Sequence, residues 1–452
     1  MLTYELKKAP GVPIYEALYR CIRADILSGK LAAGEKLPSK RALAAHLEVS
    51  KITVEAAYNQ LAAEGYVVAR EKVGYFVELV ETVSQPQISV PVTRPAQEAQ
   101  ELVDLTANLP ARFPFSVWSR LQREVLQDHG HQLLEPLDQQ GSAELRSAIA
   151  DHLAGFRGMQ VDPGNIIIGA GTDFLYNLLL QLLGRDKVYA LEEPGYSKIR
   201  SIYEAAGAAT RSAVMDLEGV LPEALADADV LHFSPSHHFP SGIITGQKRR
   251  QALLAWAGEE KWIIEDDYDS EFRFDAHPMR AMYTGEGRVI YINSFTKSLA
   301  PSIRIGYMIL PTALMAQYKA MLGFYGCTVS GFEQQTLARF LSQGHFEKHI
   351  NRMRKFYRNH RNRLQQILQS SPRAHQLTIE EADAGLHFLV RVDTQMPDAA
   401  LTQLCADMGL QVRALSEYYH GDVPGESHHC LVINYSGLKD ADLDRLGQIL
   451  GR

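Results

Sequence analysis

The chain has 452 residues, 46% of them hydrophobic and 22% charged, which is typical of a globular protein with several domains. Its formal net charge is −7, yet residues 1–80 hold 11 Lys and Arg against 9 Asp and Glu, so a nucleic-acid-binding module is best sought there. No apolar run reaches the roughly 20 residues of a membrane span, and the first residues lack the apolar core of a secretory signal. The four cysteines have no metal-ligand spacing, so we expect a cytoplasmic protein with reduced thiols and no bound metal.

The beginning of the chain shows the pattern of three consecutive helices. Apolar residues recur at helical spacing in 14–28, 37–47 and 49–65. Ser39 and Ser50 stand where an N-cap is needed, because a serine hydroxyl can accept a hydrogen bond from a free N–H at a helix start. Three short helices with brief connections are typical of a helix-turn-helix domain.

A β-hairpin is predicted after these helices. YVVAR and YFVEL flank EKVG, which places Gly74 at the turn, and the whole set predicts a winged helix-turn-helix. GEKLPSKRALAAHLEVSKITVEAAYNQLAAEGY resembles the GntR-type DNA-binding domain, whose pattern is roughly KLPS-x-R-x-LA-x-x-L-x-VSR-x-TV. The resemblance covers residues 11–80 and implies that residues 1–80 bind double-stranded operator DNA.

The candidate DNA contacts lie at the helix starts and in the wing, because a recognition helix presents its N-terminal residues to base edges while its neighbours hold phosphate. They are Ser39, Arg41, Ser50, Lys51, Thr53 and Gly74. Any one of them alone is more often part of a solvated face of a small helical domain, but the whole pattern in order favours DNA binding. Lys51 stands where the GntR family usually has arginine, and lysine lacks the planar fork that suits guanine.

Residues 81–103 are rich in Pro, Gln, Ser and Thr and are predicted to be a linker. From residue 104 to the end at 452, apolar strand-like runs alternate with amphipathic helical stretches, which indicates an α/β domain with a largely parallel sheet. The expected strands are NIIIGAG, KVYALEE, DVLHFSP, WIIEDDY, RVIYINS and IRIGYMIL. From about residue 340 the pattern becomes helical and then α+β.

Several motifs of the second domain fit the parts of a site for pyridoxal 5′-phosphate (PLP). A lysine can form a Schiff base with PLP, and SFTKSLAPSIRIGYM supplies Lys297. GAGT follows a strand and opens a helix, so Gly171 and Thr172 can meet a phosphate. Tyr196 of EEPGY is a candidate to stack on the pyridine ring.

The remaining parts of this site come from two further motifs. In EDDYDSEF, Asp266 can pair with a protonated pyridine nitrogen and Tyr268 can hydrogen-bond the ring hydroxyl. Ser294 and Arg304 flank Lys297 and can complete a phosphate cradle. Each motif is common by itself, and an acidic EDD alone is more often a solvated loop. Together, and in this order, the motifs are specific.

In this order the motifs resemble those of fold-type I aminotransferases over residues 104–450. EEPGY, PSHHFPSG, EDDYDSEFRF and SFTKSLAPSIRIGYM resemble the version found in MocR-type regulators, which fuse a GntR winged helix to an aminotransferase-like domain. The resemblance implies a fold-type I transferase fold with a large parallel-rich sheet and a small α+β C-terminal subdomain. It also implies PLP on Lys297, regulation of transcription and a head-to-tail homodimer.

Three positions depart from the aminotransferase pattern. Aminotransferases hold the substrate α-carboxylate with an arginine in a stretch like R-x-N-x-(A/S)-G, and VINYSGL places Val432 there. A valine cannot pair with a carboxylate, so either Arg413 replaces the arginine from a neighbouring strand or Val432 is a core residue in a shifted alignment. EPLDQQG lacks the tyrosine of a YGDP-like turn, and Phe239 stands where many aminotransferases have asparagine.

The sequence therefore predicts a PLP-dependent transcription regulator whose effector is PLP itself, as in a vitamin B6 sensor, or an amine without a carboxylate. One alternative is an active aminotransferase that carries a DNA-binding domain, and Val432 argues against it. Another is a dimeric scaffold with neither cofactor nor turnover. The retained PLP-contacting residue types argue against the scaffold, since the fold alone does not need them.

Overall fold

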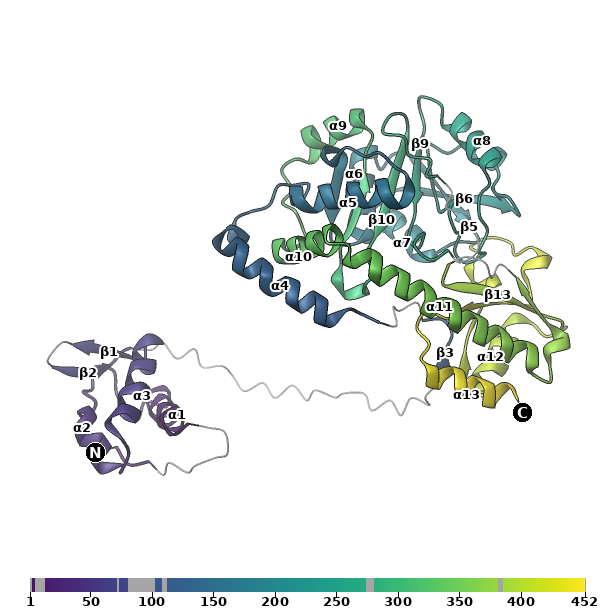
Figure 1. The fold of residues 1–452 in the computed structure, drawn as a ribbon. Coiled ribbons are helices and arrows are strands. Elements are labelled where there is room, and N and C mark those ends of the chain that lie inside the picture. Colours follow the sequence, from purple (N-terminus) through teal and green to yellow (C-terminus); the bar gives the residue numbers. More distant parts are fainter. Residues whose placement is uncertain are drawn as a thin grey trace. The chain divides into compact units, whose positions relative to one another are not determined.

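The computed structural model describes residues 2–4, 13–70, 73–79, 102–107, 112–273, 280–380 and 385–451. The chain forms two compact units, Met1–Gln97 and Glu98–Arg452 (Figure 1). Most of the predicted linker, 81–103, lies outside the described residues. Its last residue begins strand β3 (Val103–Asp104), so the second unit starts slightly earlier than the sequence pattern indicates.

The N-terminal unit contains the three predicted helices and the hairpin. Their bounds are α1 (Ile14–Leu27), α2 (Lys40–His46), α3 (Lys51–Ala63), β1 (Val67–Arg70) and β2 (Gly74–Val77). Leu18, Leu43 and Val54, one from each helix, are fully buried together in the core of this unit. The predicted caps are present, because Ser39 Oγ accepts from the Ala42 N–H at 3.2 Å and Ser50 Oγ from the Thr53 N–H at 3.0 Å.

The hairpin pairs β1 with β2 in antiparallel register, with Arg70 opposite Gly74. Gly74 is thus the first residue of β2 and not the centre of the turn, whose residues 71 and 72 lie outside the described residues. Its φ of +132° suits glycine, and a Cβ there would lie 3.1 Å from Lys36 Cε. The wing therefore favours glycine for its own backbone conformation as well as for any close approach to DNA.

The large sheet of the second unit has the order β4-β11-β10-β9-β8-β5-β6-β7. Strands β5, β6, β8, β9 and β10 are parallel to their neighbours in this set, while β11 runs antiparallel to both β10 and β4. The bounds are β4 (Ile166–Gly169), β5 (Val188–Glu193), β6 (Ala209–Asp216), β7 (Gly219–Val220), β8 (Val230–Phe233), β9 (Trp262–Asp266), β10 (Val289–Ser294) and β11 (Gly306–Ile309). All six predicted strands are present, whereas β6 and β7 were not predicted.

Helices cover both faces of this sheet (Figure 1). Alternate residues of one strand enter different cores: Ile166 and Ile168 pack with α5 and α10, while Ile167 packs with α6 and α9. A sheet buried on both faces explains why its strands are continuous apolar runs. The bounds are α4 (Phe115–His129), α5 (Ala143–Arg157), α6 (Thr172–Leu183), α7 (Ser197–Ala205), α8 (Gln247–Ala257), α9 (Thr312–Leu322), α10 (Gly331–Ser342) and α11 (His345–Ser370).

The C-terminal subdomain is α+β, as the sequence predicts. Its antiparallel sheet has the order β12-β13-β16-β15, and β3 pairs in parallel with β14 beside it. The register sets Arg413 of β15 opposite Val432 of β16. The bounds are β12 (Leu377–Glu380), β13 (His387–Val392), α12 (Asp398–Asp407), β14 (Leu410–Gln411), β15 (Arg413–Ala414), β16 (Cys430–Asn434) and α13 (Asp440–Leu450). The N-terminal helices with their hairpin confirm the predicted winged helix, and the two sheets of the second unit confirm the predicted fold-type I transferase architecture.

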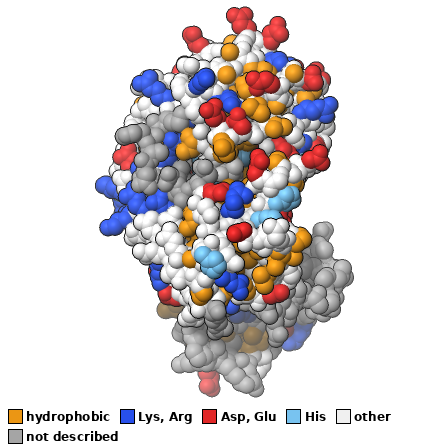
Figure 2. Space-filling model, turned by 90° about the vertical axis from the view of Figure 1, so that its right-hand side faces the viewer, with side chains coloured by type: hydrophobic (Ala, Val, Ile, Leu, Met, Phe, Trp, Pro, Cys, Tyr) orange, Lys and Arg blue, Asp and Glu red, His pale blue; other side chains and the backbone are white. Residues whose placement is uncertain are grey.

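The surface has mixed charge on the face that Figure 2 draws, where the acidic and basic side chains of the described residues are interspersed. This agrees with the small net charge of −7. Among the described residues, no helix has the length and apolar character that crossing a membrane requires.

Leu43→Ala should destabilise the N-terminal unit alone, because Leu43 is fully buried in the core of that unit. We expect a loss of about 2–5 kcal/mol in the free energy of unfolding of this unit. Native-state hydrogen exchange should show reduced protection of amides in 13–79 and unchanged protection in 112–273. Ile52→Ala is the matched control, since Ile52 is 78% exposed. An equal loss of amide protection in both units would contradict the division of the chain into two independently stable units.

Candidate cofactor and nucleic-acid sites

A cavity of about 470 Å³ lies where strands β5, β8, β9 and β10 reach their carboxyl ends. This edge of a parallel sheet is where α/β proteins usually bind ligands. The cavity brings together residues that lie far apart in the sequence, and its lining includes seven of the eight predicted cofactor residues: Thr172, Tyr196, Asp266, Tyr268, Ser294, Lys297 and Arg304. The eighth, Gly171, is the N-cap of α6 and touches Arg304.

Lys297 lies in the turn that follows β10 and is half-buried. Burial lowers the pKa of its amino group to about 8, and the nearby carboxylate of Asp269 acts in the opposite direction. An unperturbed lysine has a pKa near 10.4. Lys297 therefore holds a larger fraction of neutral, nucleophilic amine near neutral pH than an ordinary lysine does.

Asp266, the last residue of β9, is buried and faces the cavity. Its Oδ2 accepts a hydrogen bond from the Tyr176 hydroxyl and lies 3.3 Å from His232 Nε2. Its Oδ1 is buried and has no hydrogen-bond partner in the described part of the chain. Buried carboxylate oxygens are normally satisfied, so this oxygen fits a donor from a bound group, such as a protonated ring nitrogen.

The neighbours of Asp266 have their own partners. Glu265 lies 3.7 Å from Arg250, and Asp267 lies 2.9 Å from Arg157. Burial would raise the pKa of the Asp267 carboxyl, but Arg157 and the Tyr291 hydroxyl hold it below its usual value. The acidic EDD stretch is therefore buried, and only its middle carboxylate faces the cavity, because side chains alternate along a strand.

A positively charged cradle forms at the start of α6. Gly171 has φ +83°, and a Cβ there would lie 2.6 Å from Arg304 Nη2, so only glycine lets the guanidinium approach. Arg304 Nη2 donates to the Ala170 carbonyl at 2.9 Å and lies 3.5 Å from Asp173. With the N-terminus of α6 at Thr172 and the Ser294 hydroxyl, this arrangement suits a phosphate group.

The two predicted tyrosines line the same cavity. Tyr196 is 51% exposed, and its ring meets that of Phe239 edge to face at 6.1 Å. The hydroxyl of Tyr268 lies 3.2 Å from His237 Nδ1, and that nitrogen lies 2.8 Å from Asp269 Oδ2. Burial raises the pKa of Tyr268 well above its usual value, so its phenol stays protonated and can donate a hydrogen bond.

Several residues of this cavity escaped the sequence analysis. Tyr176 and His232 fix Asp266 from α6 and β8, and no short motif contains them. Lys198 and Arg200 follow EEPGY directly and add two cations to the wall. Lys198 pairs with Asp173 at 2.7 Å and Arg200 with Glu193 at 3.4 Å. The position of Lys198 and Arg200 just after a cofactor motif was the only available signal for them.

In the N-terminal unit, Ser39, Arg41, Ser50 and Lys51 are exposed at the starts of α2 and α3. Thr53 is half-buried, and its hydroxyl lies 2.8 Å from Ser50 Oγ. The serine and threonine hydroxyls thus take part in hydrogen bonds at the helix starts. Among the predicted DNA contacts, this leaves Arg41 and Lys51 as the exposed cations. Arg70 on β1, which was not predicted, lies over the Phe76 ring at 4.6 Å and adds an exposed cation to the wing.

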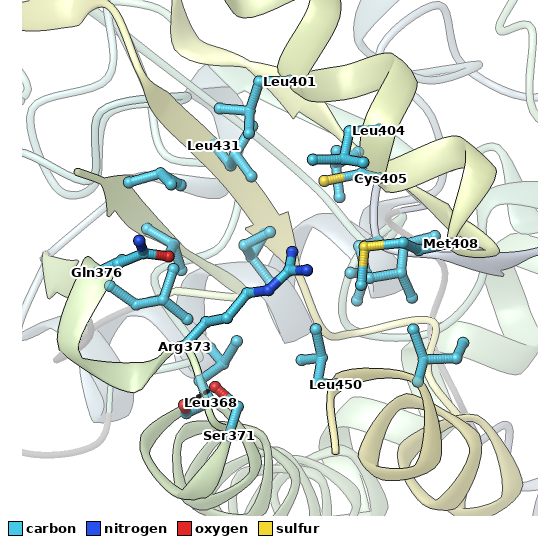
Figure 3. Close-up of a pocket in the computed structure, with 18 of the residues that line it drawn as sticks. Leu368, Ser371, Arg373, Gln376, Leu401, Leu404, Cys405, Met408, Leu431 and Leu450 are labelled. Atoms are coloured by element: carbon cyan, nitrogen blue, oxygen red, sulfur yellow. Dashed lines mark hydrogen bonds between the residues drawn. The ribbon is translucent and has the colours of Figure 1, made fainter. Parts of the chain in front are cut away.

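A second cavity, of about 670 Å³, lies in the C-terminal subdomain between its sheet and the helices α11, α12 and α13 (Figure 3). Its wall is mainly apolar, and Arg373 points into it among Leu401, Leu431 and Leu450. It shares no lining residue with the Lys297 cavity.

The described cysteines are all free thiols, and no cluster of His, Cys, Asp or Glu among the described residues could hold a metal ion. The functional groups that line the Lys297 cavity are its lysine, its buried carboxylate and its cationic cradle.

The fold and these sites define a winged-helix DNA-binding protein joined to an aminotransferase-like domain. Two family models match: bacterial regulatory proteins of the gntR family over residues 14–77, and aminotransferase class I and II over residues 100–450. The chain belongs to the MocR-type regulators, which combine these two domains. Pyridoxal 5′-phosphate is the cofactor that the family and the fold indicate.

Individual proteins agree with this assignment. The chain is 31% identical to the probable rhizopine catabolism regulatory protein MocR of Rhizobium meliloti, over 96% of this chain and 92% of that protein. It is 33% identical to the HTH-type pyridoxine biosynthesis transcriptional regulator PdxR of Corynebacterium glutamicum, over 88% of this chain and 87% of that protein. The crystal structure of a multiple substrate aminotransferase from Thermococcus profundus shares the fold, with a TM-score of 0.68 and 21% identity over 78% of this chain and 92% of that one.

The rate at which apoprotein reacts with PLP should rise with pH and level off above about 8, because the neutral amine of Lys297 is the reactive form. Asp269→Asn should move this midpoint lower, since the Asp269 carboxylate raises the pKa. Stopped-flow absorbance measures both. A midpoint near pH 10, as for an exposed lysine, would show that burial does not lower the pKa of the Lys297 amine.

Proposed function

We propose that this regulator senses the state of its cofactor site and changes its affinity for operator DNA in response. The observation that carries the proposal is the buried Asp266 Oδ1, which lacks a partner among the described residues and lies beside Lys297 and a phosphate-type cradle. Bound PLP would supply an electron-withdrawing ring and an electrophilic carbon. Retaining all of these groups fits a site that holds the cofactor and not an inert scaffold.

Each candidate residue then has one task. Lys297 would attach PLP through its amino group, Asp266 would pair with the ring nitrogen, Tyr268 would donate to the ring hydroxyl and Tyr196 would stack on the ring. Gly171, Thr172, Ser294 and Arg304 would hold the phosphate. The contacts of Arg304 with Ala170 and Asp173 orient its guanidinium for this task.

Operator binding falls to the winged helix. Lys51 and Arg41 reach the DNA as cations, while Ser39, Ser50 and Thr53 organise the two helix starts that face phosphate, and Gly74 allows the wing to come close. We assign residues 1–80 to this domain, 81–103 to a linker whose last residue, Val103, already begins β3, and 104–452 to the PLP domain. A head-to-tail homodimer in the cytoplasm would read paired half-sites.

Two kinds of effector fit the proposal. PLP itself is one, and the pyridoxine biosynthesis regulator PdxR, 33% identical, favours such a vitamin B6 sensor. The other is a small amine that would take the place of the Lys297 amino group on the cofactor. Catalytic transamination with an incidental DNA domain is the rival function. It requires steady release of keto acid, and it is less favoured because Val432 of β16 stands where aminotransferases have their carboxylate-binding arginine.

Asp266→Asn should weaken PLP binding about tenfold or more, because an amide cannot neutralise a protonated ring nitrogen. Calorimetric titration of apoprotein with PLP measures the affinity. Asp407→Asn is the control, since Asp407 lines the second cavity. Equal affinity for wild type and Asp266→Asn would remove the main support for the proposed ring contact.

The proposal is tested by fluorescence anisotropy of DNA from upstream of the protein's own gene, with and without PLP, at a fixed salt concentration. We expect specific binding that differs between the two states, and weaker binding by Lys51→Ala at every sequence tested. Specific binding that ignores PLP would leave an amine as the effector. Absence of specific binding in both states would favour the transaminase alternative.

A further inference from the structure

Arg413 is an exposed arginine on the wall of the Lys297 cavity. The other basic residues of the wall differ from it. Lys198 and Arg304 both contact Asp173, and Arg200 contacts Glu193. Arg413 forms no ion pair with any described residue, and its one assigned contact is a hydrogen bond with the neutral Tyr418 hydroxyl. The cavity therefore presents a guanidinium whose charge is not neutralised by the described chain.

The strand register explains how Arg413 reaches this wall. Arg413 of β15 lies directly opposite Val432 of β16, and directly opposed residues of antiparallel strands point to the same face. Val432 packs beside Phe239 and Tyr418, and both of these line the Lys297 cavity. Asn434, two residues further along β16, lines it as well. The face that carries Val432 is thus the cavity face, and the arginine enters it from one strand away.

We infer that Arg413 binds the carboxylate of an amine effector, so that the ligand of this site is a primary amine that also carries a carboxylate. This inference rests on the proposed cofactor function of Lys297. The amino group would be directed to the Lys297 side of the cavity and the carboxylate to the β15 side. A planar guanidinium can donate two parallel hydrogen bonds to a carboxylate, which a lysine ammonium cannot do.

The phosphate of PLP is a less suitable partner for Arg413. A phosphate already has the N-terminus of α6, Ser294 and Arg304, which belong to the elements of the large sheet. Arg413 belongs instead to the C-terminal subdomain, on a strand that contributes nothing to that cradle. The valine at 432 therefore does not exclude carboxylated amines, contrary to the expectation from the sequence, because the cation has a second position from which to reach them.

The test uses the full-length holoprotein and matched ligand pairs. Glycine, β-alanine, 4-aminobutyrate and the common α-amino acids are titrated by calorimetry, each against the amine that lacks its carboxylate. Wild type should bind at least one carboxylated amine more tightly than its matched amine. Arg413→Gln should weaken that carboxylated ligand about 10- to 100-fold and leave the matched amine within about twofold. Arg413→Lys should restore only part of the affinity.

Two further variants separate binding from general damage. Moving the cation across the strand pair, in the double variant Arg413→Val with Val432→Arg, should recover affinity that Arg413→Val alone loses. Arg373→Gln is the control, because Arg373 is also an exposed arginine of this subdomain but points into the other cavity (Figure 3). PLP content should be unchanged in all of these variants.

The outcomes distinguish this inference from the proposed function. If wild type binds neither operator DNA specifically nor PLP, or lacks one of these activities, the proposed function is wrong. If wild type binds both, but carboxylated amines bind Arg413→Gln as tightly as wild type, only the role of Arg413 is wrong. Operator affinity that responds to PLP while no carboxylated amine binds would likewise overturn the role of Arg413.

Discussion

The cofactor site depends on a buried carboxylate that lines the cavity and keeps one oxygen unpaired. Asp266 is held at the end of β9 by Tyr176 and His232, and its second oxygen is left without a partner among the described residues. Burying a charged group in this way costs free energy unless a partner arrives. The flanking Glu265 and Asp267 also have one buried oxygen each without a hydrogen bond, but a guanidinium lies near each of them, Arg250 at 3.7 Å and Arg157 at 2.9 Å. A bound ring with a protonated nitrogen would donate a hydrogen bond to the unpaired oxygen of Asp266 and so offset the cost of burying this carboxylate.

The rest of the second unit serves to hold this position. The parallel strands bring their carboxyl ends to one edge, so that Asp266, Ser294 and the turn with Lys297 meet although the chain separates them. Helix α6 supplies both Tyr176, which fixes Asp266, and the N-terminus that forms the cradle with Arg304. One helix therefore couples the ring end of the site to its phosphate end.

Much of this arrangement could be predicted from the sequence, because local patterns carry it. The serine caps of α2 and α3, the apolar runs of the central strands and the motif around Lys297 are all short-range signals. Strand β6, which lies next to the short edge strand β7, was missed because its alternating, partly exposed residues lack an apolar run. Tyr176, His232 and the placement of Arg413 opposite Val432 depend on tertiary packing and strand register, which no short motif encodes.

We propose that ligand binding at the cofactor site and operator binding by the winged helix are coupled. Such coupling is reciprocal, so a ligand that changes operator affinity by some factor must have its own affinity changed by operator by the same factor. The direct measurement is the affinity of the full-length protein for PLP with and without saturating operator DNA. The account predicts different affinities, in the ratio found for operator binding with and without PLP. If the affinity for PLP is identical with and without operator, and if no amine tested changes operator affinity, the two domains act independently.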